Sequence, residues 1–253
     1  MQAGIEVWTA QPDRLGCETC AELAALLEPG ERERVAQLRF DADRRAFVVA
    51  HALRRFALGM AMAVDPRDLR FGTGPHGQPV VVNAGGELPS FSLTRSRGLV
   101  ACAVSLVGPV GIDVEPVRDD ADPEVLGPYM DAATDTDGAV TFCQQWTALE
   151  AFWKARGLGL SAAHPRIRLR PLEDADECFE VVYGDSGRSS GLVVLRLPAP
   201  RSHVLTLACR EVASVRMVDF ERLAAKPRSL DEAPGTTCAD RRCERAAASP
   251  IEP

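Results

Sequence analysis

The order of helix and strand patterns is the most constraining feature of this chain, because a long helix followed by several strands occurs twice. The first helix, capped by Asp41 or Asp43, is predicted to run through Met62, and the second over Phe142–Arg156. Strands are expected after the first helix at 69–71, 79–82, 90–94, 99–107 and 110–115, and after the second at 166–170, 178–182, 192–197, 203–209 and 215–220. This order indicates a coarse duplication, although no residue-level repeat relates the two portions.

Other segments have simpler patterns. Residues 5–8 are predicted to form a strand, and residues 18–27 and 31–40 two helices separated by Pro29-Gly30. Residues 116–140 are rich in Asp, Pro and Gly and are expected to form a loop with at most a short helix. From Lys226 onward the chain has few large apolar residues, which predicts a disordered tail over 226–253.

Composition excludes several classes of protein. The 29 basic and 36 acidic residues give a net charge of -7, so the chain lacks the basic character of a nucleic-acid-binding protein. There is no apolar run long enough to span a membrane and no secretory signal pattern at the N-terminus, which predicts a cytoplasmic protein. Eight cysteines include one C-x-x-C pair at Cys17 and Cys20, but no histidine lies beside it, so a zinc site is not expected. Disulfides are not expected either, because the cytoplasm is reducing.

The first stretch with chemical content is Gly111-Ile-Asp113-Val-Glu115-Pro. On a strand, side chains alternate between faces, so Asp113 and Glu115 are expected on the face opposite Ile112 and Val114. The two carboxylates would lie ~7 Å apart and repel each other unless a cation lies between them. Oxygen ligands of this kind suit magnesium beside substrate phosphates. The alternative is an exposed strand with two solvated acids.

The second stretch is the helix over Phe142–Arg156, followed by Gly157. Its apolar positions fall on one stripe: Phe142, Trp146, Leu149 and Trp153. Glu150 and Lys154 lie one turn apart beside that stripe, at the boundary between core and solvent where a cleft can form. The alternative is an ordinary surface pair worth a few tenths of a kcal/mol.

Together, the two stretches resemble the signature motifs of the phosphopantetheinyl transferases, G-I-D-x-E and F-x-x-x-W-x-x-x-E-x-x-x-K-x-x-G. Every fixed position is matched here, and the segments around Arg44–Arg54, Gly77–Pro79 and Phe91–Ser96 are also similar. The resemblance covers about residues 30–210. It is to the long, monomeric kind related to the surfactin-synthetase activator, because the G-I-D-x-E motif lies in mid-chain.

The resemblance implies an α+β fold of two pseudo-twofold-related halves, with the active site in the cleft between them. Residues 1–108 would form an N-terminal half that contacts coenzyme A phosphates, and residues 109–225 a C-terminal half with the metal and catalytic residues. Magnesium, or alternatively manganese, would be held by Asp113, Glu115 and Glu150.

The implied reaction is that of a holo-acyl-carrier-protein synthase type transferase. Phosphopantetheine would pass from coenzyme A to a serine of an apo acyl or peptidyl carrier protein, releasing 3',5'-ADP. The carrier could belong to fatty-acid, polyketide or nonribosomal-peptide synthesis, and the long type suggests the polyketide and nonribosomal-peptide pathways of secondary metabolism. Glu150 and Lys154 would be the catalytic residues. The expected coenzyme A contacts share a position near the phosphates: Arg45, Gln78, Pro79, Thr94, Arg95 and Lys154.

Three departures from the family pattern leave alternatives open. Gln78 replaces a common Lys, Arg95 replaces a common His, and an acidic stretch at 116–140 replaces an apolar docking helix. The first two predict an altered affinity for coenzyme A, and the third leaves the choice of carrier protein open. The alternatives are a catalytically weak relative that binds coenzyme A or carrier protein, and a magnesium-dependent pyrophosphate hydrolase.

Overall fold

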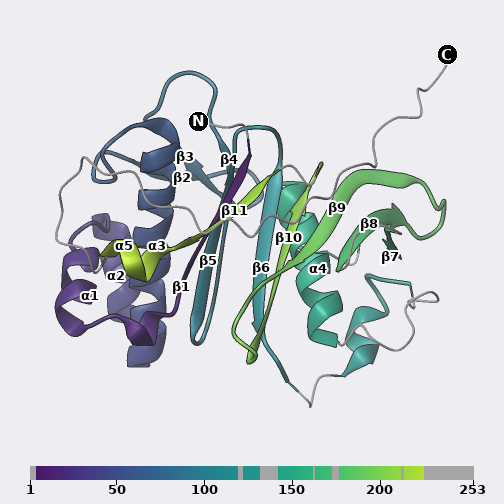
Figure 1. The fold of residues 1–253 in the computed structure, drawn as a ribbon, viewed down its shortest axis with the longest axis horizontal. Helices are drawn as coiled ribbons and strands as arrows, with labels where there is room; N and C mark the ends of the chain where they lie inside the picture. The colour runs from purple at the N-terminus through teal and green to yellow at the C-terminus, as the bar shows by residue number, and fades with distance from the viewer. Residues whose placement is uncertain are drawn as a thin grey trace.

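The computed structural model describes residues 4–118, 122–131, 142–161, 163–172, 177–211 and 214–224. The fold is α+β, as the resemblance implies, with two main sheets side by side (Figure 1). The first sheet has the order β11-β1-β5-β4, formed by Val215–Asp219, Ile5–Ala10, Leu99–Ser105 and Ser90–Ser96. β1 pairs in parallel with β11 and antiparallel with β5. β5 is buried along its whole length, which places it at the centre of this sheet.

Four helices lie beside this sheet and form the first structural unit with it. They are α1 (Cys17–Ala24), α2 (Pro29–Gln37), α3 (Asp41–Met62) and the short α5 (Phe220–Ala224). α3 packs its apolar face, including Leu53 and Leu58, against Val100 and Cys102 of β5. It ends where Ala63 adopts a left-handed conformation, two residues before the Asp65-Pro66 pair expected to close it. Phe220 was predicted to be the last residue of a strand over 215–220, but that strand stops at Asp219 and Phe220 begins the short helix α5.

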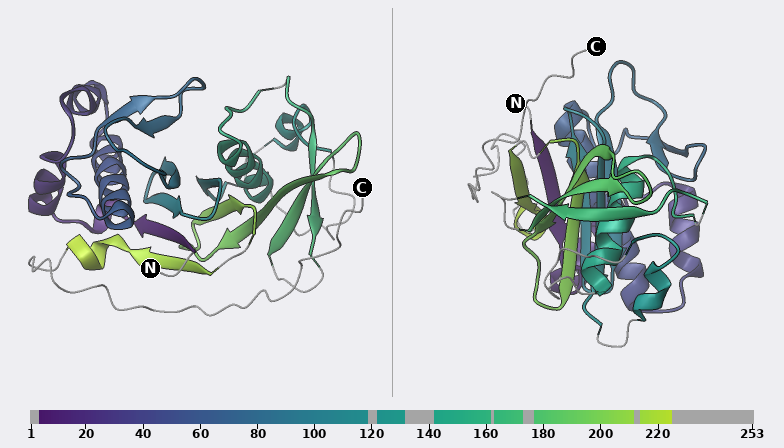
Figure 2. Two further views of the ribbon diagram at one scale, coloured as in Figure 1. Left: turned by 90° about the horizontal axis from the view of Figure 1, so that it is seen from above. Right: turned by 90° about the vertical axis from the view of Figure 1, so that its right-hand side faces the viewer.

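The second sheet has the order β6-β10-β9-β8-β7. Its strands are Val110–Pro116, His203–Cys209, Ser189–Leu197, Cys178–Tyr183 and Ile167–Pro171. Helix α4 (Phe142–Ala155) packs on it, and its core joins Leu149 and Phe152 to Ile167 and Val194. A separate pair, β2 (Phe71–Thr73) and β3 (Pro79–Val81), rises beside the first unit (Figure 2).

Strand β11 pairs with the sheet of the half other than the one predicted for it. The sequence placed residues 215–219 in the C-terminal half, but they pair with β1 in the sheet of the N-terminal half. The two structural units are therefore not contiguous in sequence. The predicted tail over 226–253 lies outside the described residues. In the part of the chain that the structure describes, no helix has both the length and the apolar character needed to cross a membrane.

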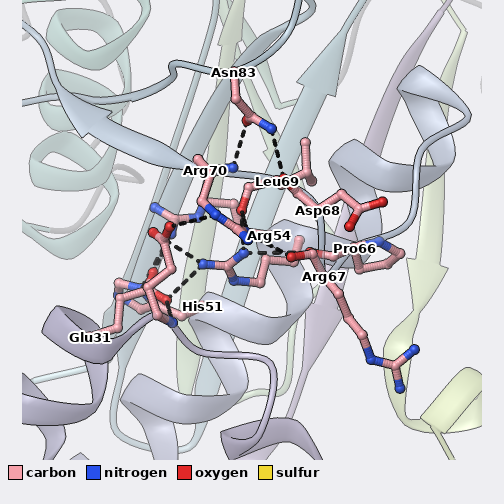
Figure 3. A network of polar contacts seen from close by, with 11 residues as sticks. Glu31, His51, Arg54, Pro66, Arg67, Asp68, Leu69, Arg70 and Asn83 are labelled. Carbon is pink, nitrogen blue, oxygen red and sulfur yellow. Dashed lines mark hydrogen bonds and ion pairs between the residues drawn. The ribbon is translucent and has the colours of Figure 1, made fainter.

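A buried polar network fastens α2 to α3 (Figure 3). Glu31 accepts hydrogen bonds from Arg54 at 2.6 Å and Arg55 at 2.9 Å, and lies 2.8 Å from His51 Nδ1. Arg55 also donates to the Leu69 carbonyl at 2.7 Å, which brings in the segment that leads to β2. The predicted helix break at Pro29 is instead the first residue of α2, because Glu28 and Glu31 form a capping box there.

The two main sheets meet along β4 and β6, which are not neighbours in either sheet. Side-chain hydroxyls of β4 replace the missing backbone ladder. Ser90, Ser92 and Thr94 accept hydrogen bonds from the backbone N–H groups of Val110, Ile112 and Val114 at 3.1, 3.1 and 3.3 Å. We call these three hydroxyls the hydroxyl seam. Because strand side chains alternate, residues 90, 92 and 94 all face β6.

Candidate active site

Strand β6 presents its residues as the alternation predicts. Ile112 and Val114 are buried in the core shared with Leu205 and Leu207. Asp113 lies opposite Thr206 of the neighbouring strand β10, and Glu115 lies opposite Val204. The two acids differ in environment, because Asp113 is buried with 5% of its surface exposed, whereas Glu115 is half-buried. The open alternative of two solvated acids is therefore wrong for Asp113.

Gly111 allows α4 to approach β6 closely. A Cβ atom at this position would lie 2.0 Å from the Ala151 carbonyl oxygen and 2.5 Å from the Ala155 nitrogen. Both contacts are to backbone, which cannot move aside as a flexible side chain would. The absence of a side chain at Gly111 thus brings the Glu150 and Lys154 turn of α4 over the strand that carries Asp113.

Lys154 and Asp113 form the closest contact between these two elements. Lys154 Nζ lies 2.6 Å from Asp113 Oδ1 and 3.4 Å from the Ile112 carbonyl oxygen. The Lys154 side chain is 31% exposed, so it lies at the boundary between the core and solvent. The ion pair of Lys154 is therefore with Asp113 of β6, rather than the i,i+4 surface pair with Glu150 that the sequence also allowed.

Asp113 has one satisfied and one unsatisfied oxygen. Oδ1 accepts hydrogen bonds from Lys154 and from the Thr94 hydroxyl at 3.0 Å. Oδ2 is buried and has no hydrogen-bond partner among the described residues. A buried carboxylate oxygen without a partner is costly, and such atoms mark places where a donor or a cation binds.

Glu150 completes a local group of carboxylates. Burial raises the pKa of Glu150; the nearby Lys154 ammonium lowers it, and the charges of Asp113 and Glu115 raise it further. The net direction is upward. The negative charges of Asp113 and Glu115 thus repel the charged form of Glu150. A cation bound among the three carboxylates would relieve this repulsion.

Residues for a metal ion are present, but they do not converge into a ready-made centre. Within the described ranges, no three His, Cys, Asp or Glu side chains gather closely enough to hold a metal. Two of the acids form ion pairs with basic residues of the protein itself: Asp113 pairs with Lys154, and Glu115 lies 3.1 Å from Arg118. The unsatisfied Asp113 Oδ2 and the all-oxygen donor set still fit a hard divalent cation.

The aromatic side chains of α4 support this site unevenly. Leu149 and Trp153 are buried as predicted. Phe142 and Trp146 are only half-buried and stack on each other with ring centroids 5.9 Å apart. Phe152, which the predicted stripe omitted, is fully buried. The core face of α4 is therefore wider than one stripe.

Comparison with known proteins shows which family the chain belongs to. The chain is 30% identical over 165 residues to the 4'-phosphopantetheinyl transferase HetI of a Nostoc species, a match that spans 61% of this chain and 70% of HetI. The chain belongs to the 4'-phosphopantetheinyl transferase family. It is also 26% identical over 166 residues to Sfp of Bacillus subtilis, covering 62% of this chain and 72% of Sfp. Over 204 residues it is 26% identical to psf-1 of Bacillus pumilus, covering 73% and 85%. No family model matches the chain.

The predicted coenzyme A contacts of this transferase are partly engaged with the protein itself. Arg45 donates to the Leu15 carbonyl at 3.2 Å. Gln78 folds back on its own turn, where its side-chain oxygen accepts from the His76 N–H at 3.0 Å, and Pro79 begins β3. The Arg95 guanidinium lies over the Phe47 ring, 5.3 Å from its centroid.

Thr94, also predicted to contact coenzyme A, is bonded within the protein to strand β6. Its hydroxyl is buried and accepts from Val114 N–H while donating to Asp113. The sequence did not indicate this contact, nor the buried pair of Thr147 on α4 and Thr206 on β10, whose hydroxyl oxygens lie 2.8 Å apart. The regular spacing of the hydroxyls at residues 90, 92 and 94 is the signal that could have indicated the seam.

Proposed function

We propose that this transferase moves the phosphopantetheine arm of coenzyme A to a serine of an apo acyl or peptidyl carrier protein and releases 3',5'-ADP. The observation that carries the proposal is the meeting of the two motifs at the 2.6 Å contact of Lys154 with Asp113, beside Glu150. In family terms this is the holo-acyl-carrier-protein synthase type of activity.

The residues divide the reaction between them. The serine oxygen of the carrier forms a bond to the phosphorus that bears the pantetheine arm, and the bond from that phosphorus to the bridging oxygen of 3',5'-ADP breaks. Glu150 takes the serine proton, directly or through water, a role supported by its upward-shifted pKa. Lys154 stabilises or protonates the departing phosphate oxygen, since its ammonium group is partly exposed beside Asp113.

Asp113, Glu115 and Glu150 would hold magnesium, or alternatively manganese, at this site. Such an ion neutralises the charge that develops on a transferring phosphoryl group and its leaving group. Asp113 supplies its free Oδ2, and Glu115 and Glu150 supply the charge that attracts a cation.

On the coenzyme A side, Arg45, Gln78, Pro79, Arg95 and Lys154 remain the proposed contacts. Arg45 and Arg95 are cations on α3 and β4, whose guanidinium groups suit phosphate oxygens. In this proposal residues 1–108 provide mainly phosphate contacts, and residues 109–225 the metal and catalytic groups, with β11 as a structural exception.

The carrier would approach the segment that follows β6, where Val117 and Val125 are about half exposed. Two acids of the predicted acidic stretch are already engaged: Asp122 caps a short 3-10 helix at Pro123–Leu126, and Asp131 lies 3.1 Å from Arg166. Four further aspartates of this stretch, Asp119, Asp120, Asp135 and Asp137, lie outside the described residues. The proposed enzyme acts as a cytoplasmic monomer.

Intact-mass spectrometry of several apo carrier proteins with this protein, coenzyme A and Mg²⁺ tests the proposal. We expect a metal-dependent gain of one phosphopantetheine on the carrier serine, which is lost in Glu150→Ala. Glu33→Ala, an exposed glutamate on α2, is the matched control and keeps the activity. Release of cleaved coenzyme A without carrier would instead indicate a hydrolase.

A second candidate is a relative that binds coenzyme A or carrier protein with weak catalysis. Two contacts favour it: Gln78 is folded onto its own turn, and Arg95 lies over Phe47. Both proposed coenzyme A contacts are thus engaged with the protein itself. Coenzyme A binding with no mass gain on any carrier would support it against the transfer reaction.

A further inference from the structure

Thr94 differs from the other two members of the hydroxyl seam. Within the described part of the chain, the Ser90 and Ser92 hydroxyls take part only in the bonds that they accept from backbone N–H groups of β6. Thr94 accepts from Val114 N–H at 3.3 Å and also donates its hydroxyl proton to Asp113 Oδ1 at 3.0 Å. The buried Thr94 hydroxyl of β4 is thus bonded to two groups of β6, the backbone N–H of Val114 and the carboxylate of Asp113.

This second bond decides which Asp113 oxygen is free. Oδ1 accepts from both the Thr94 hydroxyl and the Lys154 ammonium group, whereas Oδ2 is buried with no hydrogen-bond partner among the described residues. Lys154 is on a long flexible side chain that is 31% exposed, so it can move. Thr94 is 6% exposed, and a β-branched side chain has few allowed rotamers, so its hydroxyl is the rigid one of the two donors.

We propose that Thr94 is a positioning residue for the transfer reaction, because its hydroxyl fixes the Asp113 carboxylate with Oδ2 free for a divalent cation. The inference rests on the proposed function, in which Asp113 holds that cation. It gives Thr94 a role through Asp113 rather than the direct contact with coenzyme A phosphate that the sequence indicated.

Three variants separate this role from a structural one. Thr94→Val keeps the shape of the side chain and removes the hydroxyl. Thr94→Ser keeps the hydroxyl on a freer side chain. Ser92→Ala is the matched control, because it removes a seam bond of the same kind, to Ile112 N–H, without touching Asp113.

The first measurement is the kinetics of carrier modification at saturating Mg²⁺. Because a hydrogen bond to a charged group is lost, we expect kcat of Thr94→Val to fall about 10- to 100-fold, with KM for coenzyme A within about 2-fold of wild type. Thr94→Ser and Ser92→Ala should stay within about 3-fold in kcat. Equal losses in Thr94→Val and Ser92→Ala would overturn the proposal in favour of a purely structural seam. A raised KM with unchanged kcat would overturn it in favour of direct substrate contact.

The second measurement does not depend on turnover. Isothermal titration calorimetry of coenzyme A with and without Mg²⁺ should show that Thr94→Val loses about 10-fold of the Mg²⁺-dependent gain in affinity and nothing of the affinity without metal. In an Asp113→Asn background the same substitution should have no further effect. An unchanged gain in Thr94→Val, an additional loss in the Asp113→Asn background, or a wild type indifferent to Mg²⁺ would each refute the role of Thr94.

The two proposals fail in distinguishable ways. A wild-type protein that binds coenzyme A with Mg²⁺ but modifies no carrier refutes the proposed function, and the calorimetric comparison still decides the role of Thr94. If Thr94→Val melts below the assay temperature, a comparison of Thr94→Ser with wild type remains. A Thr94→Ser protein with the Mg²⁺-dependent gain abolished would then show that the hydroxyl itself is not what positions Asp113.

Discussion

The network around Glu31 makes a quantitative prediction about stability. Glu31→Gln removes the negative charge that neutralises two buried arginines, of which Arg54 has 4% and Arg55 0% of its side chain exposed. Breaking a buried ion pair by removing one partner costs about 3–5 kcal/mol. Arg55 keeps Glu28 at 3.3 Å and the Leu69 carbonyl, so we expect the lower end, about 3 kcal/mol. For a domain of this size that corresponds to a fall in Tm of about 6–12 °C.

The pKa of Glu31 gives an independent check on the size of the effect. Burial alone would raise this pKa, but the contacts with His51, Glu28 N–H and Arg55 outweigh burial and lower it from 4.5 to about 2. Such a difference is equivalent to at most about 3 kcal/mol, and solvent screening at the edge of the site reduces it. Because the folded-state pKa is depressed, this stabilisation is present above pH 4.5 and is lost as pH falls toward 2.

Urea denaturation of wild type, Glu31→Gln and Glu33→Gln at several pH values measures both effects. Glu33 is an exposed residue of the same helix, so Glu33→Gln makes the same change of charge without the network. We expect a free-energy gap of about 3 kcal/mol at pH 7 for Glu31→Gln, narrowing below pH 4.5, and almost none for Glu33→Gln. Equal effects of the two substitutions, or a gap that stays constant down to pH 3, would refute the reasoning.

Two other predictions concern buried positions in the two units. Gly111→Ala places a Cβ atom 2.0 Å from the Ala151 carbonyl oxygen, so we expect a loss of about 3 kcal/mol or more, read as a fall in Tm by calorimetry; a Tm within about 2 °C of wild type would contradict it. Burial raises the pKa of Cys102 and of Cys209 to about 12, so iodoacetamide at pH 8 should label exposed Cys17 and spare both until the protein unfolds, as peptide mass mapping would show. Rapid labelling of Cys102 in the folded protein would count against this interpretation.

Local patterns predicted the elements that carry the site. The alternation over residues 110–115 and the helical period over 142–156 correctly placed Asp113 on a strand and Glu150 with Lys154 on a helix. The family resemblance was likewise confirmed. The strand alternation and the helical period are both short-range signals, since each depends on residues within a few positions of one another.

The features that the sequence did not predict depend on contacts between distant segments. The bond from Thr94 to Asp113 exists only because β4 and β6 come side by side, and hydroxyl spacing along β4 does not name its partner. Arg54 and Arg55 carry charges that normally indicate a surface, and only the fold shows that Glu31 compensates them in the interior. The same limit applies to β11, whose apolar pattern indicates a strand but not the sheet that it joins.

The pairing of β1 with β11 has a consequence for how the protein is made. Ile5 is aligned with Val215, so one edge of β1 has no partner until more than two hundred residues have been synthesised. Contacts this far apart in sequence slow folding, because a long loop must close before the pairing is gained. Until then β1 presents an open strand edge, the kind of surface that pairs with other chains. A nascent or truncated chain that stops before Val215 is therefore expected to aggregate through β1, even though its first helices and strands are already complete.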